Sequence, residues 1–85
     1  MQHYISLFFN YAMIITMKIK AKEFIKDKLK QKKITYLELS VLMQEKGYDY
    51  SDNTIRSKIN RGSYSFVFLL EVCDSLNIDI VCLEK

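Results

Sequence analysis

Residues 53–62 carry the side chains of this chain that are best suited to bind another molecule. The segment runs Asn-Thr-Ile-Arg-Ser-Lys-Ile-Asn-Arg-Gly and holds three cations and no acid. Since a helix advances about 100° per residue, Ile55 and Ile59 share one side of it. The amides, hydroxyls and cations fall on the other sides, where they can bond to base edges and phosphates. The segment therefore predicts a short helix, held by two apolar residues, that is suited to a groove of nucleic acid.

The composition predicts one small helical domain. The chain has 85 residues, 49% of them hydrophobic, with no proline and only two glycines, Gly47 and Gly62. A chain of this length supports a single core. Because long loops, sandwiches and barrels all need more turn residues than these, an all-α fold is expected.

Charge is distributed unevenly along the chain, whose formal net charge is +3. Residues 17–33 hold eight lysines against two acids, whereas residues 66–85 hold four acids against one lysine. Segregated charge of this kind suits a domain with one face towards a polyanion. A solvated helix face explains the lysines equally well.

The residue types needed for catalysis or metal binding are scarce. His3 is the only histidine, and neither a glycine-rich phosphate loop nor a nucleophile–base pair is visible. Cys73 and Cys82 fit no metal pattern or redox pair, and Cys73 stands among apolar helical residues, as a small buried hydrophobe would. We therefore expect no enzymatic activity, no cofactor and no metal site, in a cytoplasmic, nucleoid-associated protein.

Residues 1–16 contain no lysine, arginine, aspartate or glutamate and are mostly apolar. They are too few to span a membrane comfortably and lack the positive start of a signal peptide. We expect the functional chain to begin at Met17, with an upstream leader that is read through or appended. The alternative is an extra strand or apolar arm used in dimerisation or at a membrane surface. The predicted organisation is thus a leader or arm over residues 1–16 and a single helical DNA-binding domain over residues 17–85.

Helix start and stop signals divide the rest of the chain. A first helix is expected over residues 21–32. Thr35, with Glu38 as the partner in a capping box, begins a second helix that runs to about Lys46 and stops at Gly47. The apolar residues expected to face the core are Ala21, Phe24, Ile25 and Leu29 in the first helix and Tyr36, Leu39, Ser40 and Met43 in the second, with Leu37 and Leu42 near the edges.

Two further helices follow. Ser51 or Asp52 caps the helix that Gly62 ends, and Ser65 caps a helix over residues 66–76 that Asn77 stops. Residues 78–83 alternate weakly and fit either a short strand or a final helical turn. The expected core residues of the last helix are Phe66, Leu69, Leu70, Cys73 and Leu76.

This order of elements resembles the Xre/Cro-type repressor helix-turn-helix family over roughly residues 24–83. It looks still closer to a small bacterial helix-turn-helix domain family of unknown function. The residues that carry the first resemblance are Thr35 with Leu39-Ser40, Ile59-Asn60-Arg61-Gly62, and Ser65 with Leu69-Leu70 and Leu76-Asn77-Ile78; those that carry the second are Thr35, Tyr36, Glu38 and Leu39, then Lys58, Ile59, Arg61 and Gly62, then Phe66, Leu70 and Glu71.

The resemblance implies a compact repressor-like fold of four to five helices, usually a dimer on a two-fold-related operator. Two departures predict a tilt of the third helix away from the family's docking pose. About seven residues, 45–51, join the second and third helices, where the family uses a tight turn. The apolar pair Ile55 and Ile59 is also spaced by four residues, where the common spacing is three.

The leading hypothesis is sequence-specific binding of double-stranded DNA by a small transcriptional regulator. Asn53 and Ser57 would read bases, since Asn bonds bidentately to adenine and Ser pairs with several edges. Arg56 could reach a guanine, while Lys58 and Arg61 would mostly fix phosphates. In the family that this chain resembles, a polar residue stands at the start of the second helix. Tyr36 stands at that position here, and its hydroxyl would contact the DNA backbone. The candidate DNA-binding residues are Tyr36, Asn53, Thr54, Arg56, Ser57, Lys58, Asn60 and Arg61.

The same residues also fit simpler explanations. The helix could be a surface helix with solvated charges, and Asn60, next to a terminal glycine, could serve only in local capping. A protein-interaction module, antitoxin-like or adaptor, is the alternative function. Its contact surface would be the apolar N-terminal arm together with Tyr48, Tyr50, Tyr64 and Phe66, because aromatic residues are favoured at interfaces.

Overall fold

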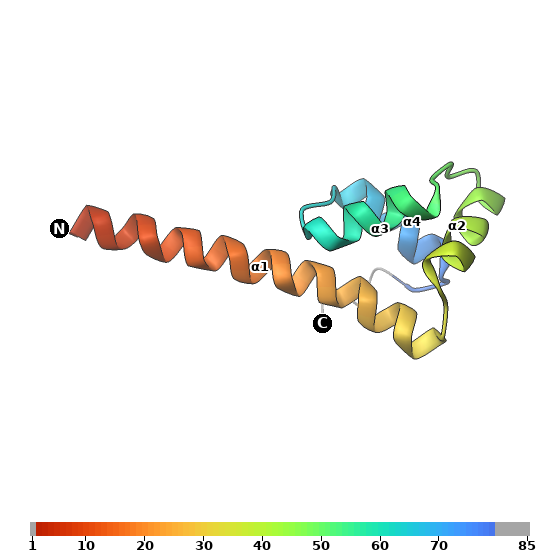
Figure 1. The fold of residues 1–85 in the computed structure, drawn as a ribbon, viewed down its shortest axis with the longest axis horizontal. Coiled ribbons are helices and arrows are strands. Elements are labelled where there is room, and N and C mark those ends of the chain that lie inside the picture. The colour runs from red at the N-terminus through yellow and green to blue at the C-terminus, as the bar shows by residue number, and fades with distance from the viewer. Residues whose placement is uncertain (1, 80–85) are drawn as a thin grey trace.

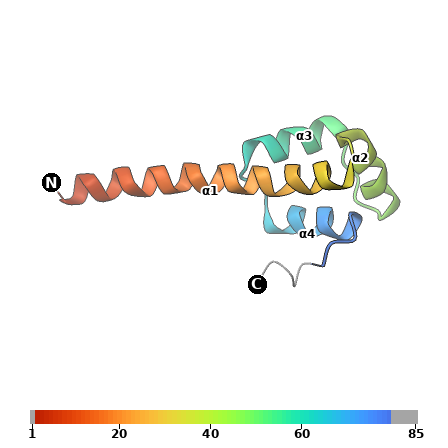
Figure 2. The same ribbon diagram turned by 90° about the horizontal axis from the view of Figure 1, so that it is seen from below.

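Four helices follow one another along the part of the chain that the structure describes. The computed structural model describes the backbone of residues 2–79 and the side chains of residues 13–79. Figure 1 shows a long first helix that projects beyond a bundle built from its C-terminal half and three short helices. Viewed from below, α3 and α4 flank the line of α1 (Figure 2). The helices are α1 (Gln2–Lys32), α2 (Tyr36–Glu45), α3 (Asp52–Arg61) and α4 (Phe66–Ser75).

The all-α prediction is confirmed for the described residues, none of which forms a strand. Ile78 and Asp79 have no regular structure. The rest of the segment for which a strand or helical turn was expected, residues 80–83, lies outside the described residues.

Side-chain caps begin the three short helices where the sequence predicts them. The Thr35 hydroxyl accepts a hydrogen bond from the Glu38 amide at 3.1 Å, and the Glu38 carboxylate accepts one from the Thr35 amide at 3.0 Å. These bonds hold the pKa of Glu38 below its ordinary value. Ser51 and Ser65 cap α3 and α4 in the same way, without a reciprocal glutamate. Each cap satisfies backbone donors that a helix start otherwise leaves unpaired.

Left-handed residues end the short helices. Gly47, Gly62 and Asn77 have φ angles of 91°, 67° and 58° and follow α2, α3 and α4. A residue in this conformation turns the chain away from the helix axis and lets the last carbonyls be satisfied. The predicted stops are thus confirmed, although α4 ends at Ser75 and not at Leu76.

The first helix is much longer than the sequence analysis predicts. It begins at Gln2, so the expected start at residue 21 is wrong, and so is the alternative of a strand within residues 2–16. The physical reason is that no glycine or proline interrupts residues 2–32. With nothing to stop it, the helix continues past the bundle, and residues 13–20 are exposed.

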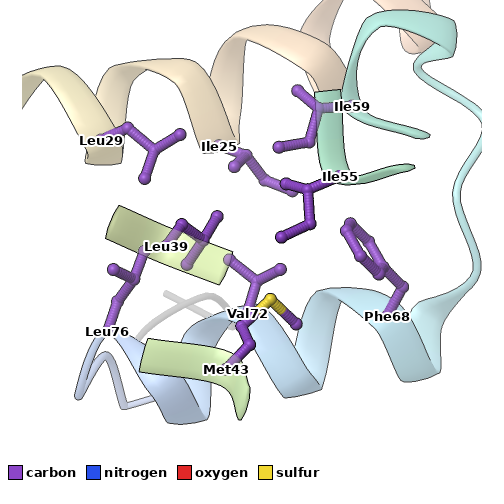
Figure 3. Packing of buried hydrophobic residues seen from close by; sticks show 9 residues of the cluster. All are labelled: Ile25, Leu29, Leu39, Met43, Ile55, Ile59, Phe68, Val72 and Leu76. Atoms are coloured by element: carbon purple, nitrogen blue, oxygen red, sulfur yellow. The ribbon is translucent and has the colours of Figure 1, made fainter. Parts of the chain in front are cut away.

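The core draws on all four helices. Figure 3 shows the two isoleucines of α3 directed towards Ile25 of α1 on one side and towards α4 on the other. α2 closes the bundle with Leu39 and Met43, both fully buried. The core cluster consists of Ile25, Leu29, Leu39, Met43, Ile55, Ile59, Phe68, Val72 and Leu76.

The predicted register of α4 is partly wrong. Phe66, expected in the core, is 65% exposed, whereas Phe68 and Val72 are almost fully buried. Because residues 66–70 are all apolar, the sequence pattern does not distinguish one face from another. The cap at Ser65 sets the register and turns the first residue of the helix outwards. Cys73 and Leu76 are buried as expected, and Leu69 and Leu70 are half-buried.

Gly62 allows the corner between α3 and α4 to lie directly against α1. A Cβ atom at this position would collide with the backbone carbonyl of Lys18. Gly62 is buried, and the Tyr64 hydroxyl two residues later donates a short hydrogen bond to the carbonyl of Ala21. The corner is therefore fitted to the surface of α1 at two successive turns of that helix.

We expect Gly62→Ala to destabilise the protein far more than Gly47→Ala. Both changes impose left-handed strain of about 1–2 kcal/mol. Only Gly62→Ala also forces a collision with α1, which adds about 1–3 kcal/mol, since the space around Gly47 is open. Urea denaturation of the two variants measures the difference, and equal losses of unfolding free energy would contradict the close approach.

Candidate nucleic-acid interface

The rotation of α3 about its own axis is fixed by two side chains. Ile55 and Ile59 are fully buried, and they are the only apolar residues of the helix. The opposite side carries Asn53, Ser57 and Arg61, all exposed. The sequence prediction that the two isoleucines point inwards and that the polar and cationic side chains face solvent is confirmed, except that Lys58 is half-buried.

Hydrogen bonds from α2 hold the chain just before α3. The buried Ser40 hydroxyl donates to the carbonyl of Tyr50 at 2.6 Å. Gln44, one turn further on, donates to the same carbonyl at 3.3 Å and to the Ser40 hydroxyl at 3.2 Å. Tyr50 directly precedes the Ser51 cap, so these bonds place the start of α3. The connection between α2 and α3 is therefore longer than a tight turn but well fixed at its end.

Five of the predicted site residues line one shallow depression on the outer side of α3. Two of them are already engaged within the helix. The Thr54 hydroxyl accepts a hydrogen bond from the Ser51 hydroxyl at 2.9 Å, and the Asn53 side-chain oxygen accepts a long one from Arg56 at 3.4 Å. A bidentate contact of Asn53 with a base would replace that bond. The residues lining the depression are Asn53, Thr54, Ser57, Lys58 and Arg61.

Arg56 and Tyr36 form a second part of the surface, beside the start of α2. The Arg56 guanidinium lies over the Tyr36 ring at 5.2 Å from its centroid, a favourable cation–π distance. Both residues line a hollow that also includes Lys26 and Lys30 of α1. The sequence analysis identified these lysines only as members of a basic run. Their spacing of four residues on one helix face was the available signal, but their proximity to Arg56 depends on the packing of α1 against α3.

Lys58 lies differently from the other cations of α3. It is half-buried, and its ammonium group lies 5.9 Å from the Tyr50 ring centroid and 5.7 Å from that of Phe68. Its charge is thus held at the α4 side of the depression. Asn60 is exposed but contributes to neither of the two hollows on this surface.

Three tyrosines of the alternative interaction surface are bonded within the fold. Tyr48 donates to Asp74 at 2.8 Å, Tyr50 donates to Glu71 at 2.7 Å, and Tyr64 donates to the backbone of α1. The bonds to carboxylates raise the pKa of Tyr48 and of Tyr50, and burial raises the pKa of Tyr64. Of the four aromatic residues assigned to that surface, Phe66 is the one with an exposed ring.

The described residues contain no group of three or more histidine, cysteine, aspartate or glutamate side chains that could hold a metal ion. Burial raises the pKa of the Cys73 thiol, which keeps it in its less reactive protonated form. Among the helices that the structure describes, none combines the length and the apolar character needed to cross a membrane.

The four helices and the polar outer side of α3 define a small all-helical domain with a cationic surface. Residues 17–81 match the family described as a domain of unknown function, DUF6471. Because the match covers well over half of the chain, the chain belongs to this family. No curated protein and no solved structure matches the chain significantly.

The tyrosine–carboxylate bonds predict a loss of stability at alkaline pH. The pKa of Tyr50 is raised in the folded state, so its contribution is complete below the ordinary pKa of about 10 and is lost as the pH rises through the folded value. We expect Tyr50→Phe to lower the unfolding free energy by about 1 kcal/mol at pH 8. Denaturation curves should show this difference shrinking above about pH 10.

Tyr36→Phe is the matched control, because Tyr36 lies against Arg56 on the other side of the bundle. Tyr36→Phe keeps the Tyr50–Glu71 bond, so the difference that this bond causes should be absent from it. A difference between Tyr50→Phe and wild type that stays constant up to pH 11 would contradict the role of the Tyr50–Glu71 bond.

Proposed function

We propose that this protein binds double-stranded DNA sequence-specifically by inserting α3 into the major groove. The observation that carries the proposal is the complete burial of Ile55 and Ile59. With these two side chains inside, the outer side of a ten-residue helix consists of amide, hydroxyl and guanidinium groups. Such a helix fits the dimensions of the major groove, and these groups match the hydrogen-bonding edges of bases.

The second hollow gives this surface a place for the phosphate backbone. Arg56, Lys26 and Lys30 surround the start of α2, and their positive charges favour a phosphate there. Phosphates bound there would fix the protein's orientation, while Asn53 and Ser57 contact base edges. Arg61, at the far end of α3, would meet the backbone on the other side of the groove.

The resemblance to Xre/Cro-type repressors supports the same function and implies a small transcriptional regulator in the cytoplasm. The connection over residues 46–51 and the four-residue spacing of Ile55 and Ile59 argue for a modified docking angle. The position of the acids supports a polyanionic partner as well. Glu71 and Asp74 are hydrogen-bonded on the α4 side of the bundle, which Figure 2 shows on the other side of α1 from α3.

A protein-interaction module, antitoxin-like or adaptor, is the second candidate. Leu37 and Val41 favour it, because they are 62% and 51% exposed, one turn apart on α2. They line a hollow together with Ile34 and Leu42. Salt dependence separates the two functions, since groove binding weakens steeply with salt and an apolar contact does not.

The first experiment is a selection of bound duplexes from a random library at two ionic strengths. A shared sequence motif whose recovery falls at the higher salt concentration is the expected result. Recovery of no duplex at either ionic strength would contradict DNA binding. The selected duplex is then the probe for the variants below.

We expect Arg61→Ala to weaken binding to all duplexes alike. The loss of one phosphate contact should reduce the slope of log affinity against log salt by about one. Fluorescence anisotropy titrations between about 50 and 200 mM salt measure this slope. Lys58→Ala should act in the same direction, although the Lys58 ammonium group lies closer to aromatic rings.

Lys46→Ala is the matched control for these two variants. Lys46 pairs with Asp74 at 3.9 Å on the α4 side, so its removal changes the net charge equally without touching the proposed surface. Equal effects of Lys46→Ala and Arg61→Ala would reduce the interaction to nonspecific attraction by net charge.

We expect Asn53→Ala to relax discrimination at one base position by about 1–3 kcal/mol. Titrations with duplexes that differ at single positions measure this loss. Asn60→Ala is the comparison variant, since Asn60 lies outside the depression and next to the helix end. If Asn53→Ala discriminates among bases as the wild type does, Asn53 does not read sequence.

A further inference from the structure

The N-terminal half of α1 presents an apolar surface that nothing in the described chain covers. Figure 1 shows this half extending away from the bundle. Met13, Ile14 and Met17 are about half exposed. Together with Lys18, Ala21 and the corner at Gly62 and Ser63, they line a hollow whose exposed surface is mostly apolar. An exposed apolar surface of this kind marks a contact site.

We propose that a second copy of this chain covers this surface, with the two α1 helices paired antiparallel through their N-terminal halves. In this arrangement the first turns of the partner's α1 lie in the apolar hollow beside Gly62. The two copies are related by a two-fold axis perpendicular to the helices, and each copy fills the other's hollow. The interface is therefore closed and limited to a dimer.

The spacing of apolar residues along the sequence supports pairing of helices. Tyr4, Leu7, Tyr11 and Ile14 follow one another at intervals of three, four and three residues. This is the spacing of a helix–helix seam. Continued by one heptad, through Lys18, the same series reaches Ala21, at the edge of the bundle. The seam of the pair thus continues the stripe by which α1 packs in its own chain.

Charge selects a second copy as the partner and antiparallel as the orientation. Residues 1–17 contain no lysine, arginine, aspartate or glutamate, so two copies of this stretch meet without repulsion. Residues 18–33 contain eight lysines against two acids. A parallel pair would place the two lysine-rich stretches side by side, and the like charges would repel each other. An antiparallel pair places them at opposite ends.

The resulting separation of the two bundles fits DNA, an argument that rests on the proposed function. α3 lies beside the stretch of α1 from Lys18 to Ile25, because Gly62 approaches Lys18 and Ile25 packs with the isoleucines of α3. The centre of this stretch is about twelve residues from the middle of residues 2–17, so the rise per residue separates the two α3 helices by about 36 Å along α1. This is close to the roughly 34–36 Å between successive major grooves on one side of DNA.

Sedimentation analysis of the full chain without DNA tests the pairing. The wild type should be a dimer at about 100 μM, and Ile14→Glu should weaken association at least about tenfold, because it introduces a charge into an apolar interface. Ile19→Glu is the matched control, since Ile19 is 52% exposed on the other side of α1 and should leave association unchanged. Circular dichroism confirms that both variants keep the helical fold.

Cysteine crosslinking tests the orientation in a chain that also carries Cys82→Ser. Asn10→Cys lies near the middle of residues 2–17 and should crosslink to its own copy in an antiparallel pair. Met17→Cys lies near one end of this stretch and should not. Crosslinking of both variants would identify a parallel pair and overturn the proposed orientation.

Other outcomes overturn the pairing itself. These are a wild type that is monomeric at about 100 μM, equal effects of Ile14→Glu and Ile19→Glu, and a monomer that binds vesicles of anionic phospholipid through residues 1–17. The pairing and the proposed function can fail separately. A dimer that selects no duplex refutes DNA binding alone, whereas a monomer that selects a duplex without two-fold symmetry refutes the pairing alone.

Discussion

The burial of two isoleucines determines which side chains of α3 face the solvent. A helix of ten residues with eight polar side chains is not stable alone in water, and α3 depends on its contacts with the bundle. Ile55 and Ile59 are the whole of its apolar content and are fully buried, each contributing about 1.5–3 kcal/mol. Since the two side chains point the same way, they also set the rotation of the helix. The outward direction of Asn53, Ser57 and Arg61 follows from this one packing contact.

Close approach of the backbone, in addition to apolar packing, joins α3 to the long first helix. The corner after α3 touches α1 at Gly62, and the next turn of α1 accepts a hydrogen bond from Tyr64. Both contacts involve main-chain atoms of α1. The position of the polar surface relative to the projecting half of α1 is thereby fixed. Any partner bound along that half would be held at a defined distance and angle from α3.

Most helix boundaries could be predicted from local sequence signals, whereas the packing between distant segments could not. The caps and stops of the short helices depend on neighbouring residues, and they were predicted. They are the caps at Thr35, Ser51 and Ser65 and the stops at Gly47, Gly62 and Asn77. The start of α1 was placed too late in the chain, because the prediction did not allow for a helix that continues wherever no glycine or proline interrupts it. Phe66 was wrongly assigned to the core because the run of five apolar residues hides the register of α4. The closeness of Lys26 and Lys30 to Arg56, and the carboxylate partners of Tyr48 and Tyr50, depend on contacts between helices that no local pattern encodes.

The hydroxyl bonds of Tyr48 and Tyr50 also have a consequence for the electrical shape of the molecule. They hold the carboxylates of Asp74 and Glu71 against one side of the bundle, while Arg56, Arg61 and the lysines around α2 occupy another. These two carboxylates are thus held away from Arg56 and Arg61 by rigid contacts, which adds a dipole moment across the bundle that the small net charge does not reveal. Near any polyanion, such a dipole exerts a torque before contact is made. The domain would reach the polyanion with its cationic side foremost, and fewer collisions would occur in unproductive orientations.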